Sequence, residues 1–437
     1  MSVAHRAGLP KLSESTGATR AGPVAAPRPR SAGPRVGLAL AGGGPLGATW
    51  EIGALCALQE ALPELDFTQL DGYVGVSAGA FVAAALANGM RPRELCAAFI
   101  SNRPTHPTDR INPTLFVRPA IAETLARLVT LPALATQAGL QLLLGRHSLL
   151  AAIERLGHAL PTGLLSHRAL EARLREVFSA PGRSDDFRQL RHRLVLVATD
   201  LDSGEAAPFG MPGWDHVPIS RAAAASGALP GLFTPVVIGG RTYVDGALKK
   251  TLHASVLLDQ GLDLLLCLNP LVPFDVTQAT RHRVLGSASP RLHRIVQGGL
   301  PLVLSQTFRT LIRSRLELGI KGYASSHPAT DIVLLEPDQR DPEMFLTNLF
   351  STSQRRVLAE HAYQATRADL RSRRGTLVQL LQRHGLRLDH AALDDPQRRL
   401  LSTRRAHLRA HLSELARPMK QLEEVLDDLE LSLAQAA

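Results

Sequence analysis

Short apolar runs bounded by turn-forming residues recur along the chain, and stretches with helical periodicity lie between several of them. The apolar runs predict buried strands at Arg35–Leu40, Asp71–Val76, Leu194–Thr199, Asp263–Leu268 and Asp331–Leu335. Helices are predicted at Pro45–Ala61, Ala78–Asn88 and Arg221–Phe233, the last rich in small residues and ending at LPGLF. Strands that alternate with helices indicate an α/β fold, in which helices cover both faces of a mostly parallel sheet.

Other segments depart from this alternation. Residues Asn102–Val177 are mostly helical by pattern but broken by prolines, which predicts a helical insertion. The pattern is helical again from Glu343, and His411–Ala434 forms an amphipathic helix that packs on its own domain or binds a partner. The predicted organisation is a disordered basic tail over residues 1–34, an α/β domain over 35–340 and a helical extension over 341–437.

The apolar content does not predict a membrane span. Hydrophobic residues make up 45% of the chain, enough for a large core. Gly72–Met90, Leu128–Gly145 and Ala222–Gly240 approach the length of a span, but glycines, prolines or polar residues interrupt each of them. The N-terminus lacks the apolar core of a secretory signal. We therefore expect a cytoplasmic or peripheral-membrane protein, with a transit peptide as the less favoured alternative.

Charge and cysteine content narrow the classes of partner. The net charge is +10, and only five of the 49 cationic residues are lysine. A basic surface suits anionic membranes or nucleic acid. Because aromatic residues are only 4% of the chain and no basic run is interleaved with them, we do not expect nucleic-acid binding. The three cysteines (Cys56, Cys96 and Cys267) are far apart in the sequence, so neither a disulfide framework nor a metal site is expected.

The first candidate site follows the strand predicted at Arg35–Leu40. Gly42, Gly44 and Gly47 meet the spacing G-x-G-x-x-G at the start of a helix, which is a weak signal for dinucleotide binding. A dinucleotide site also needs an acidic residue at the end of the second strand, and Ser77 stands there instead. A phosphate loop is excluded as well, because no Gly-Lys-Ser/Thr follows.

The second strand ends in Gly75–Val76–Ser77–Ala78–Gly79, the pattern G-x-S-x-G. Glycines on both sides of a serine allow a sharp strand-to-helix turn that exposes the hydroxyl as a nucleophile. Acyl transfer by a serine also needs N–H donors aimed at an oxyanion. We predict that Gly43 and Gly44 supply these donors, while Gly42 allows the turn and Gly47 allows close packing of the helix.

A serine nucleophile needs a base. Asp245 ends a predicted strand and is followed by Gly246 and Ala247, whose small size lets a partner approach. Burial would raise the pKa of this carboxyl group and make it a better base. The alternatives are that Asp245 only caps a turn, or that a histidine is the base. His253, on a predicted helix, is the histidine nearest to a motif.

In order, GGGPLG, GVSAG and VDGA resemble the three motifs of patatin-like phospholipases. The family's oxyanion motif matches Gly42–Gly47 and its nucleophile elbow matches Gly75–Gly79. Its Asp-Gly-Gly/Ala motif matches Asp245–Ala247. Two further stretches, TDLDSGE at Thr199–Glu205 and ASGALPGLFTPV at Ala225–Val236, resemble blocks that this family carries between elbow and aspartate.

The resemblance, which covers about Arg35 to Leu258, implies a three-layer α/β/α fold. It also implies hydrolysis of an acyl ester in a lipid, in which Ser77 attacks and Asp245 accepts its proton. The implied mechanism needs no metal and no cofactor. The implied partner is a lipid substrate, and the basic surface suits peripheral contact with anionic membranes.

Two departures from the family pattern keep alternatives open. The family often carries an arginine where Leu46 stands. The insertion at 102–177 is longer than a minimal family core, and it is either a lid or an ordinary elaboration. The rival hypotheses are an esterase with a histidine triad and a non-catalytic lipid-binding or scaffold protein that keeps the fold.

Overall fold

The computed structural model describes residues 33–104, 106–111, 115, 118–121, 124–127, 129, 132, 136, 160–276, 294–341 and 352–401. The predicted tail, the helix at 411–434 and most of the insertion at 102–177 lie outside the described residues.

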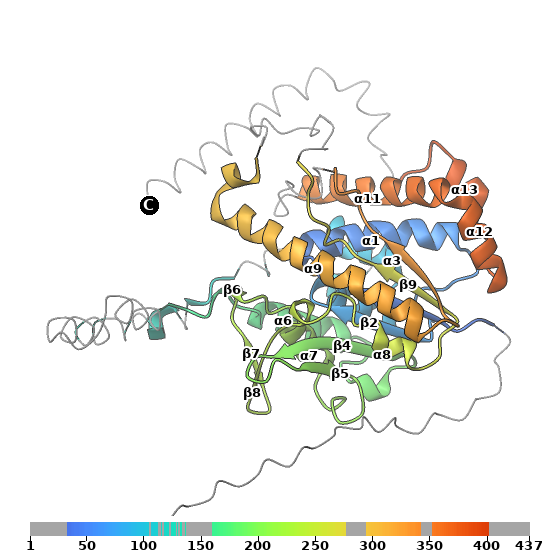
Figure 1. Ribbon diagram of the computed structural model, residues 1–437. Coiled ribbons are helices and arrows are strands. Elements are labelled where there is room, and N and C mark those ends of the chain that lie inside the picture. The colour runs from blue at the N-terminus through green and yellow to red at the C-terminus, as the bar shows by residue number, and fades with distance from the viewer. Residues whose placement is uncertain are drawn as a thin grey trace, which may run out of the picture. The chain divides into compact units, whose positions relative to one another are not determined.

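The centre of the molecule is an eight-stranded mixed sheet (Figure 1). Its strands follow the order β10-β9-β1-β2-β4-β8-β7, and β5 also pairs with β4. The five mutually parallel strands are β1 (Val36–Leu40), β2 (Gly72–Val76), β4 (Arg193–Asp200), β9 (Leu264–Leu268) and β10 (Asp331–Leu335). The antiparallel strands are β5 (Ala206–Phe209), β7 (Val236–Ile238) and β8 (Arg241–Asp245). A separate parallel pair joins β3 (Gly163–Leu165) to β6 (Gly231–Phe233).

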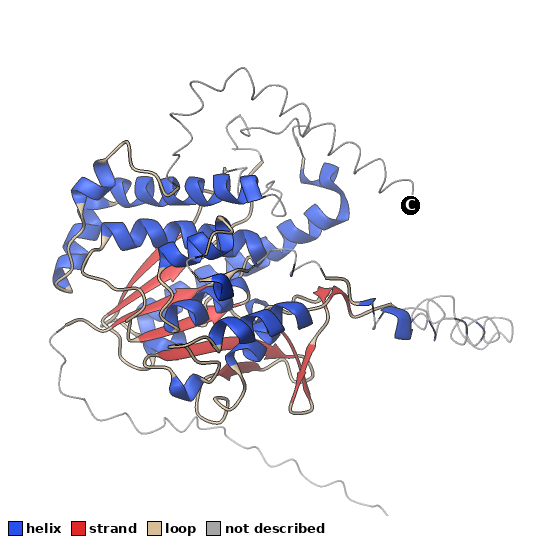
Figure 2. Cartoon of the chain, turned by 180° about the vertical axis from the view of Figure 1, so that it is seen from behind, coloured by secondary structure: helices blue, strands red, loops and turns tan. Residues whose placement is uncertain are grey.

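Helices cover both faces of this sheet (Figures 1 and 2). The α-helices are α1 (Gly44–Ala61), α2 (Ala78–Ala87), α3 (Pro92–Leu95), α6 (Arg168–Phe178), α7 (Ile219–Ser226), α8 (Ser255–Leu258), α9 (Gly299–Ser326), α11 (Thr352–Ser372), α12 (Arg374–Arg383) and α13 (His390–Asp394). Shorter helical turns are η1 (Cys96–Ile100), η2 (Pro107–Asp109), η4 (Phe187–Gln189), η5 (Gly246–Leu248) and η6 (Ile295–Gly298).

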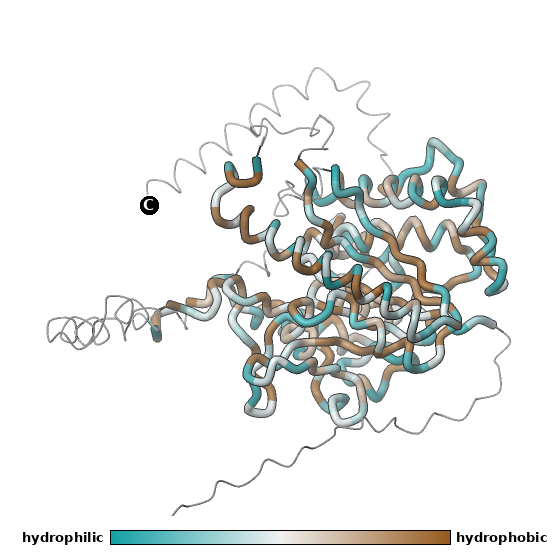
Figure 3. Tube along the Cα trace, viewed as in Figure 1, coloured by the Kyte–Doolittle hydropathy of each residue, from teal (hydrophilic) through white to brown (hydrophobic). Residues whose placement is uncertain are grey.

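Alternate residues of the central strands build two separate hydrophobic clusters. Leu38 and Leu40 of β1 belong to the cluster that holds α1, α2 and α7. Ala39, between them, belongs to the cluster that holds α8 and α9. Because successive side chains of a strand point to opposite faces, this division makes three layers. The apolar interior strands appear brown in Figure 3.

A further helical layer covers α1. Helix α11 packs along it, and the contact is close because Gly53 has no side chain: a Cβ there would lie 2.5 Å from the carbonyl oxygen of Ala359. The hydroxyl of Tyr363 donates a 2.6 Å hydrogen bond to Glu60 across this contact. Helices α12 and α13 follow α11 in the chain.

The predicted fold class, a three-layer α/β/α sandwich with a mostly parallel sheet, is confirmed. The single helix predicted over Arg221–Phe233 is wrong. Helix α7 ends at Ser226, and Gly231, with φ near +80°, starts strand β6. A positive φ cannot continue a helix, and the backbone instead pairs with β3. Among the described helices, none is both long and apolar enough to cross a bilayer.

Candidate active site

Two glycine-containing turns lie side by side at the carboxyl-terminal edge of the sheet. Strands β1 and β2 are parallel neighbours, with Leu40 opposite Gly75, so the turns that follow them leave the sheet together. A Cβ added to Gly42 would lie 2.9 Å from the Cβ of Ser77 and 3.4 Å from its Oγ. The absence of a side chain at Gly42 therefore lets the first turn contact Ser77.

Ser77 stands between β2 and α2 in a strained backbone conformation. Its φ is 55° and its ψ is −121°, a combination that a residue with a Cβ seldom adopts and that is typical of functional sites. The elbow needs glycine on both sides. A Cβ at Gly75 would lie 2.5 Å from the carbonyl oxygen of Gly79, and one at Gly79 would lie 2.5 Å from the carbonyl oxygen of Leu40. Ser77 itself is partly exposed.

As far as the described residues go, the first turn leaves two backbone donors without partners. Gly43 and Gly44 have φ values of 149° and 59°, which only glycine adopts without strain. Within the part of the chain that the structure describes, neither N–H has an acceptor. Gly44 begins helix α1, whose N-terminal end favours negative charge. A Cβ at Gly47 would meet the carbonyl oxygen of Gly42 at 3.2 Å, so this glycine allows the helix to pack closely on the turn.

Asp245 reaches Ser77 from the other side of β4. Val197 of β4 pairs with Val76, and the next residue, Ala198, pairs with Asp245. The strand ends therefore place Ser77 and Asp245 at the same level of the sheet. The Ser77 hydroxyl lies near the Asp245 carboxylate and, as a hydrogen-bond donor, lowers the pKa of that carboxyl group.

The Asp245 side chain is only 2% exposed, and its surroundings perturb its acidity. Burial raises its pKa to about 6, although the hydrogen bonds from Ser77 and from the backbone N–H of Ala247 act in the opposite direction. The Ala247 N–H lies 2.9 Å from Asp245 Oδ1, so the aspartate also caps the turn η5. A Cβ at Gly246 would lie 2.1 Å from the carbonyl oxygen of Val197, which leaves room for glycine alone.

Comparison with known families decides the membership of the chain. The family model described as patatin-like phospholipase matches residues 38–258, about half of the sequence. The chain belongs to the patatin-like phospholipase family. The resemblance predicted from the three motifs is thereby confirmed, and the match covers nearly the predicted range.

Two solved structures resemble parts of the chain at low sequence identity. VipD from Legionella pneumophila is 17% identical, with a TM-score of 0.35, over 80% of this chain and 67% of its own. The type III effector protein ExoU is 16% identical, with a TM-score of 0.32, over 78% of this chain and 53% of its own. The patatin-like chain thus spans about two thirds of VipD and about half of ExoU.

Among the described histidines, none takes the place of Asp245 beside the serine. Within the described residues, no histidine is hydrogen-bonded to Ser77 or Asp245. The helix predicted around His253 is wrong: the residue has a φ of 47° and precedes α8. Its buried ring lies 3.2 Å from the Gly246 carbonyl oxygen, and burial lowers its pKa to about 4. His253 therefore packs as a neutral ring against the turn after Asp245.

Ser226, at the end of α7, contacts the elbow and was not predicted. Its Oγ accepts a 2.8 Å hydrogen bond from the backbone N–H of Ser77 and donates a 2.6 Å bond to the carbonyl oxygen of Val197. The side chain is fully buried. The only sequence signal was its place in the block ASGALPGLFTPV, which carries no motif for an anchoring residue.

Leu46 occupies the position at which patatin-like phospholipases often carry an arginine. It is partly buried and packs against the hydrophobic cluster that holds α1 and α2. The described residues contain no group of three or more histidine, cysteine, aspartate or glutamate side chains placed to hold a metal ion.

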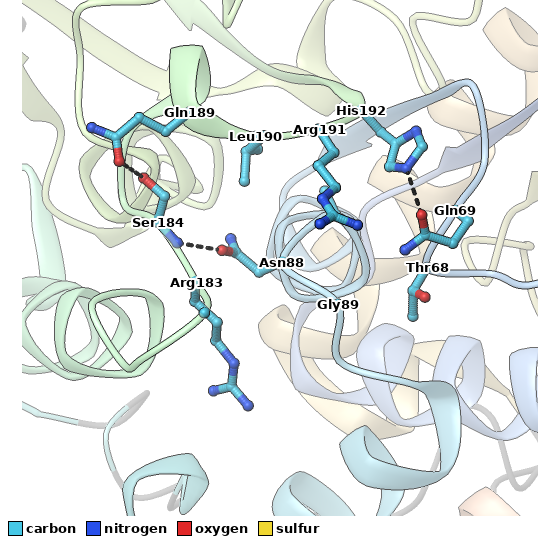
Figure 4. Close-up of a pocket in the computed structure, with 12 residues that line it drawn as sticks. Thr68, Gln69, Asn88, Gly89, Arg183, Ser184, Gln189, Leu190, Arg191 and His192 are labelled. Carbon is cyan, nitrogen blue, oxygen red and sulfur yellow. Dashed lines mark hydrogen bonds between the residues drawn. The ribbon is translucent and has the colours of Figure 1, made fainter.

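A polar cavity of about 400 Å³ lies at the opposite edge of the sheet (Figure 4). It is lined by residues that precede β2 and β4 and by the end of α2. Several of its polar groups bond to one another: His192 lies 3.0 Å from Gln69, and the Ser184 N–H donates to Asn88 at 2.8 Å. Ligands of open α/β sheets bind at the carboxyl ends of strands, where Ser77 lies. We therefore do not assign the active site to this cavity.

Proposed function

We propose that the protein is a lipid acyl hydrolase that cleaves fatty-acyl esters with Ser77 as nucleophile and Asp245 as base. The observation that carries the proposal is a strained, partly exposed serine beside a buried carboxylate whose pKa is raised to about 6. Such a carboxylate is ionised at neutral pH, yet it is far more basic than an aspartate in water.

In the first half of the reaction, Ser77 Oγ attacks the ester carbonyl carbon while its proton passes to Asp245. The carbonyl oxygen becomes an oxyanion, which accepts hydrogen bonds from the N–H groups of Gly43 and Gly44. The intermediate collapses, the bond to the alcohol breaks, and the alcohol leaves with the proton from Asp245. An acyl group then remains on Ser77.

In the second half, a water molecule attacks the acyl-enzyme and gives its proton to Asp245. Collapse of the second tetrahedral intermediate breaks the bond to Ser77 Oγ, which recovers a proton from Asp245. The fatty acid is released and the starting state is restored. Ser226 would hold the elbow in place through both halves, because its hydroxyl fixes the Ser77 N–H.

The test measures fatty-acid release from phospholipid vesicles and hydrolysis of a short-chain chromogenic ester. It compares the parent with Ser77→Ala and Asp245→Asn, each checked for folding by circular dichroism. We expect both variants to lose activity on both substrates by about a thousandfold or more. An active Asp245→Asn beside an inactive Ser77→Ala would overturn the assignment of the base in favour of a histidine. A folded parent that hydrolyses no ester would favour the scaffold hypothesis.

A further inference from the structure

Helix α9 carries a line of exposed leucines on its outer side. Leu300, Leu304, Leu311 and Leu318 are 69%, 46%, 55% and 70% exposed. With 3.6 residues per turn they fall within about 40° of one another around the helix axis, and they extend along about 27 Å of its length. We call these four residues the leucine stripe. Apolar segments recur along the whole helix in Figure 3.

The opposite side of α9 is packed against the sheet. Ile312 and Leu316 are buried in the cluster that holds α8 and β9, and Figure 1 shows α9 crossing in front of the strands. The inward apolar residues of α9 therefore pack in the core, whereas the leucines of the stripe lie outside it. Four exposed leucines aligned on one side of a helix, although Thr307 and Ser314 lie between some of them, are more typical of an interaction surface than a single exposed leucine is.

Helix α9 is attached directly to the turn that follows Asp245. The Arg315 guanidinium donates hydrogen bonds to the carbonyl oxygens of Leu248 and Lys249. The buried Thr251 hydroxyl donates a 3.1 Å hydrogen bond to the carbonyl oxygen of Ile312. The leucine stripe is thereby held in a fixed relation to the chain segment that carries the candidate base.

Cations flank the stripe. By helix geometry Arg315 and Lys321 lie on either side of it around the axis, and Lys250, in the turn after Asp245, lines the same cavity as Leu318. All three are exposed, and within the described residues neither Lys250 nor Lys321 has an acidic partner. A cavity of about 500 Å³ opens between this turn and α9, with Lys250 and Leu318 among its lining residues. Glu317 is the only acidic residue of α9, and it pairs with Arg313.

Exposed leucines flanked by lysine and arginine are the surface chemistry of a helix that lies in the interface of an anionic bilayer. The alternative occupant is a protein with an apolar groove that would cover the leucines. The excess of cations favours a bilayer over such a protein, because anionic headgroups attract cations. None of the described helices, α9 included, could cross a bilayer, so α9 would lie along its surface.

We propose that the leucine stripe is the surface through which the protein binds an anionic lipid bilayer, with Lys250 and Lys321 at headgroup level. This inference rests on the proposed function, because it brings the site of ester hydrolysis to the membrane. It assigns to α9 the role of positioning the catalytic edge over its substrate.

The test uses the full chain with Ser77→Ala, so that no substrate is consumed. Cosedimentation is measured with phosphatidylcholine vesicles, with and without phosphatidylserine. The stripe variant combines Leu304→Ser, Leu311→Ser and Leu318→Ser. The matched control is Val357→Ser, an exposed apolar position on α11. We expect the stripe variant to bind phosphatidylserine vesicles at least about tenfold more weakly, and the control to bind as the parent does.

Three outcomes would overturn the proposal. One is equal binding by the stripe variant and the parent, with both folded by circular dichroism. Another is parent binding that does not increase with phosphatidylserine. The third is a parent dimer in light scattering that the stripe variant converts to a monomer without loss of vesicle binding, which would assign the stripe to a second copy of the chain.

A kinetic comparison separates this proposal from the proposed function. With Ser77 restored, the stripe variant and the parent are assayed on vesicles and on a short-chain water-soluble ester. A loss confined to vesicles supports the surface assignment, and an equal loss on both substrates overturns it. A parent that is inert on both substrates but binds vesicles through the stripe would contradict only the proposed hydrolysis.

Discussion

The two edges of the central sheet differ in how their polar groups are satisfied. At the amino-terminal edge, Asp71 accepts a 2.8 Å hydrogen bond from the Val36 N–H, and His192 bonds to Gln69. At the carboxyl-terminal edge, Ser77 is strained and the N–H groups of the glycine turn have no acceptor within the described residues. Both edges are polar, but among the described residues it is the second that combines a strained serine with backbone N–H groups that have no acceptor.

The presence of strained residues and unpaired donors is a better guide to the candidate site than the volume of a cavity is. A cavity whose donors and acceptors already bond to one another offers a ligand little free energy, because each new bond replaces an existing one. Strained residues and unpartnered donors cost folding free energy, and they persist where the surrounding structure holds them. Four predictions test this contrast, from the largest expected effect to the smallest.

The sharpest test of the carboxyl-terminal edge is Asp245→Asn. We expect hydrolysis to fall about a thousandfold or more, because the amide cannot accept the Ser77 proton. We also expect the variant to be more stable at neutral pH. The folded pKa of Asp245 is raised to about 6, so its ionisation opposes folding, by an amount of the order of 3 kcal/mol.

Thermal melting checks the stability part of this prediction. The unfavourable contribution of Asp245 is absent at acidic pH, grows as pH rises through the interval up to about 6, and is constant above it. The advantage of Asp245→Asn over the parent should therefore be larger at pH 7.5 than at pH 4. An asparagine variant less stable than the parent at pH 7.5 would contradict the raised pKa.

The next test removes the hydroxyl that anchors the elbow. Ser226→Ala leaves the Ser77 N–H without its acceptor, so we expect kcat to fall about a hundredfold while KM changes little. Ser226→Thr keeps a hydroxyl and should recover part of the rate if its methyl group fits. An equal fall in kcat with Ser226→Ala and Ser226→Thr would point to a packing defect. Steady-state kinetics on the water-soluble ester measure the separate changes in kcat and KM.

The pH profile gives a smaller effect. If Asp245 is the base, kcat/KM depends on its ionised form and rises with pH through about 6. We expect about a tenfold increase between pH 5 and pH 7 and a plateau above, measured with an uncharged ester. A profile that is flat over this range would remove Asp245 as the group that titrates.

The smallest effect is expected at the amino-terminal edge. His192→Ala breaks the bond to Gln69 far from the catalytic edge, so hydrolysis should change by less than about twofold. The same ester assay measures it. A loss of activity comparable to that of Ser226→Ala would mean that the two edges of the sheet are coupled. It would contradict the view that hydrolysis depends on the carboxyl-terminal edge and not on the amino-terminal edge.

Much of the candidate site could be predicted because its glycines stand in recognisable motifs at the ends of strands. Gly75 and Gly47 are required by close contacts with residues four or five positions away, at the carbonyl oxygens of Gly79 and Gly42, and the glycine-rich turns are visible as motifs in the sequence. Gly42 and Gly79 are required by contacts between the two turns, which the order of the motifs alone does not show. The strands were predictable for a similar reason, since strands buried on both faces are continuous apolar runs.

The features that escaped prediction depend on distant partners. Ser226 meets the Ser77 N–H across 149 positions of chain, and a serine among alanines gives no sign of this contact. Strand β6 was assigned to a helix because its pairing with β3 is tertiary. Helix α9 was not predicted, because apolar residues on both its inward and outward sides blur the helical periodicity.

The position of the two catalytic candidates on either side of β4 has a consequence for folding. The pairing of Asp245 with Ala198 spans a short stretch of chain, but the pairing of Val76 with Val197 closes a loop of more than a hundred residues. Non-local pairings of this kind form slowly. During refolding, hydrolytic activity should therefore return later than the far-ultraviolet circular dichroism signal of the helices. The time course of activity would then report the rate at which β2 pairs with β4.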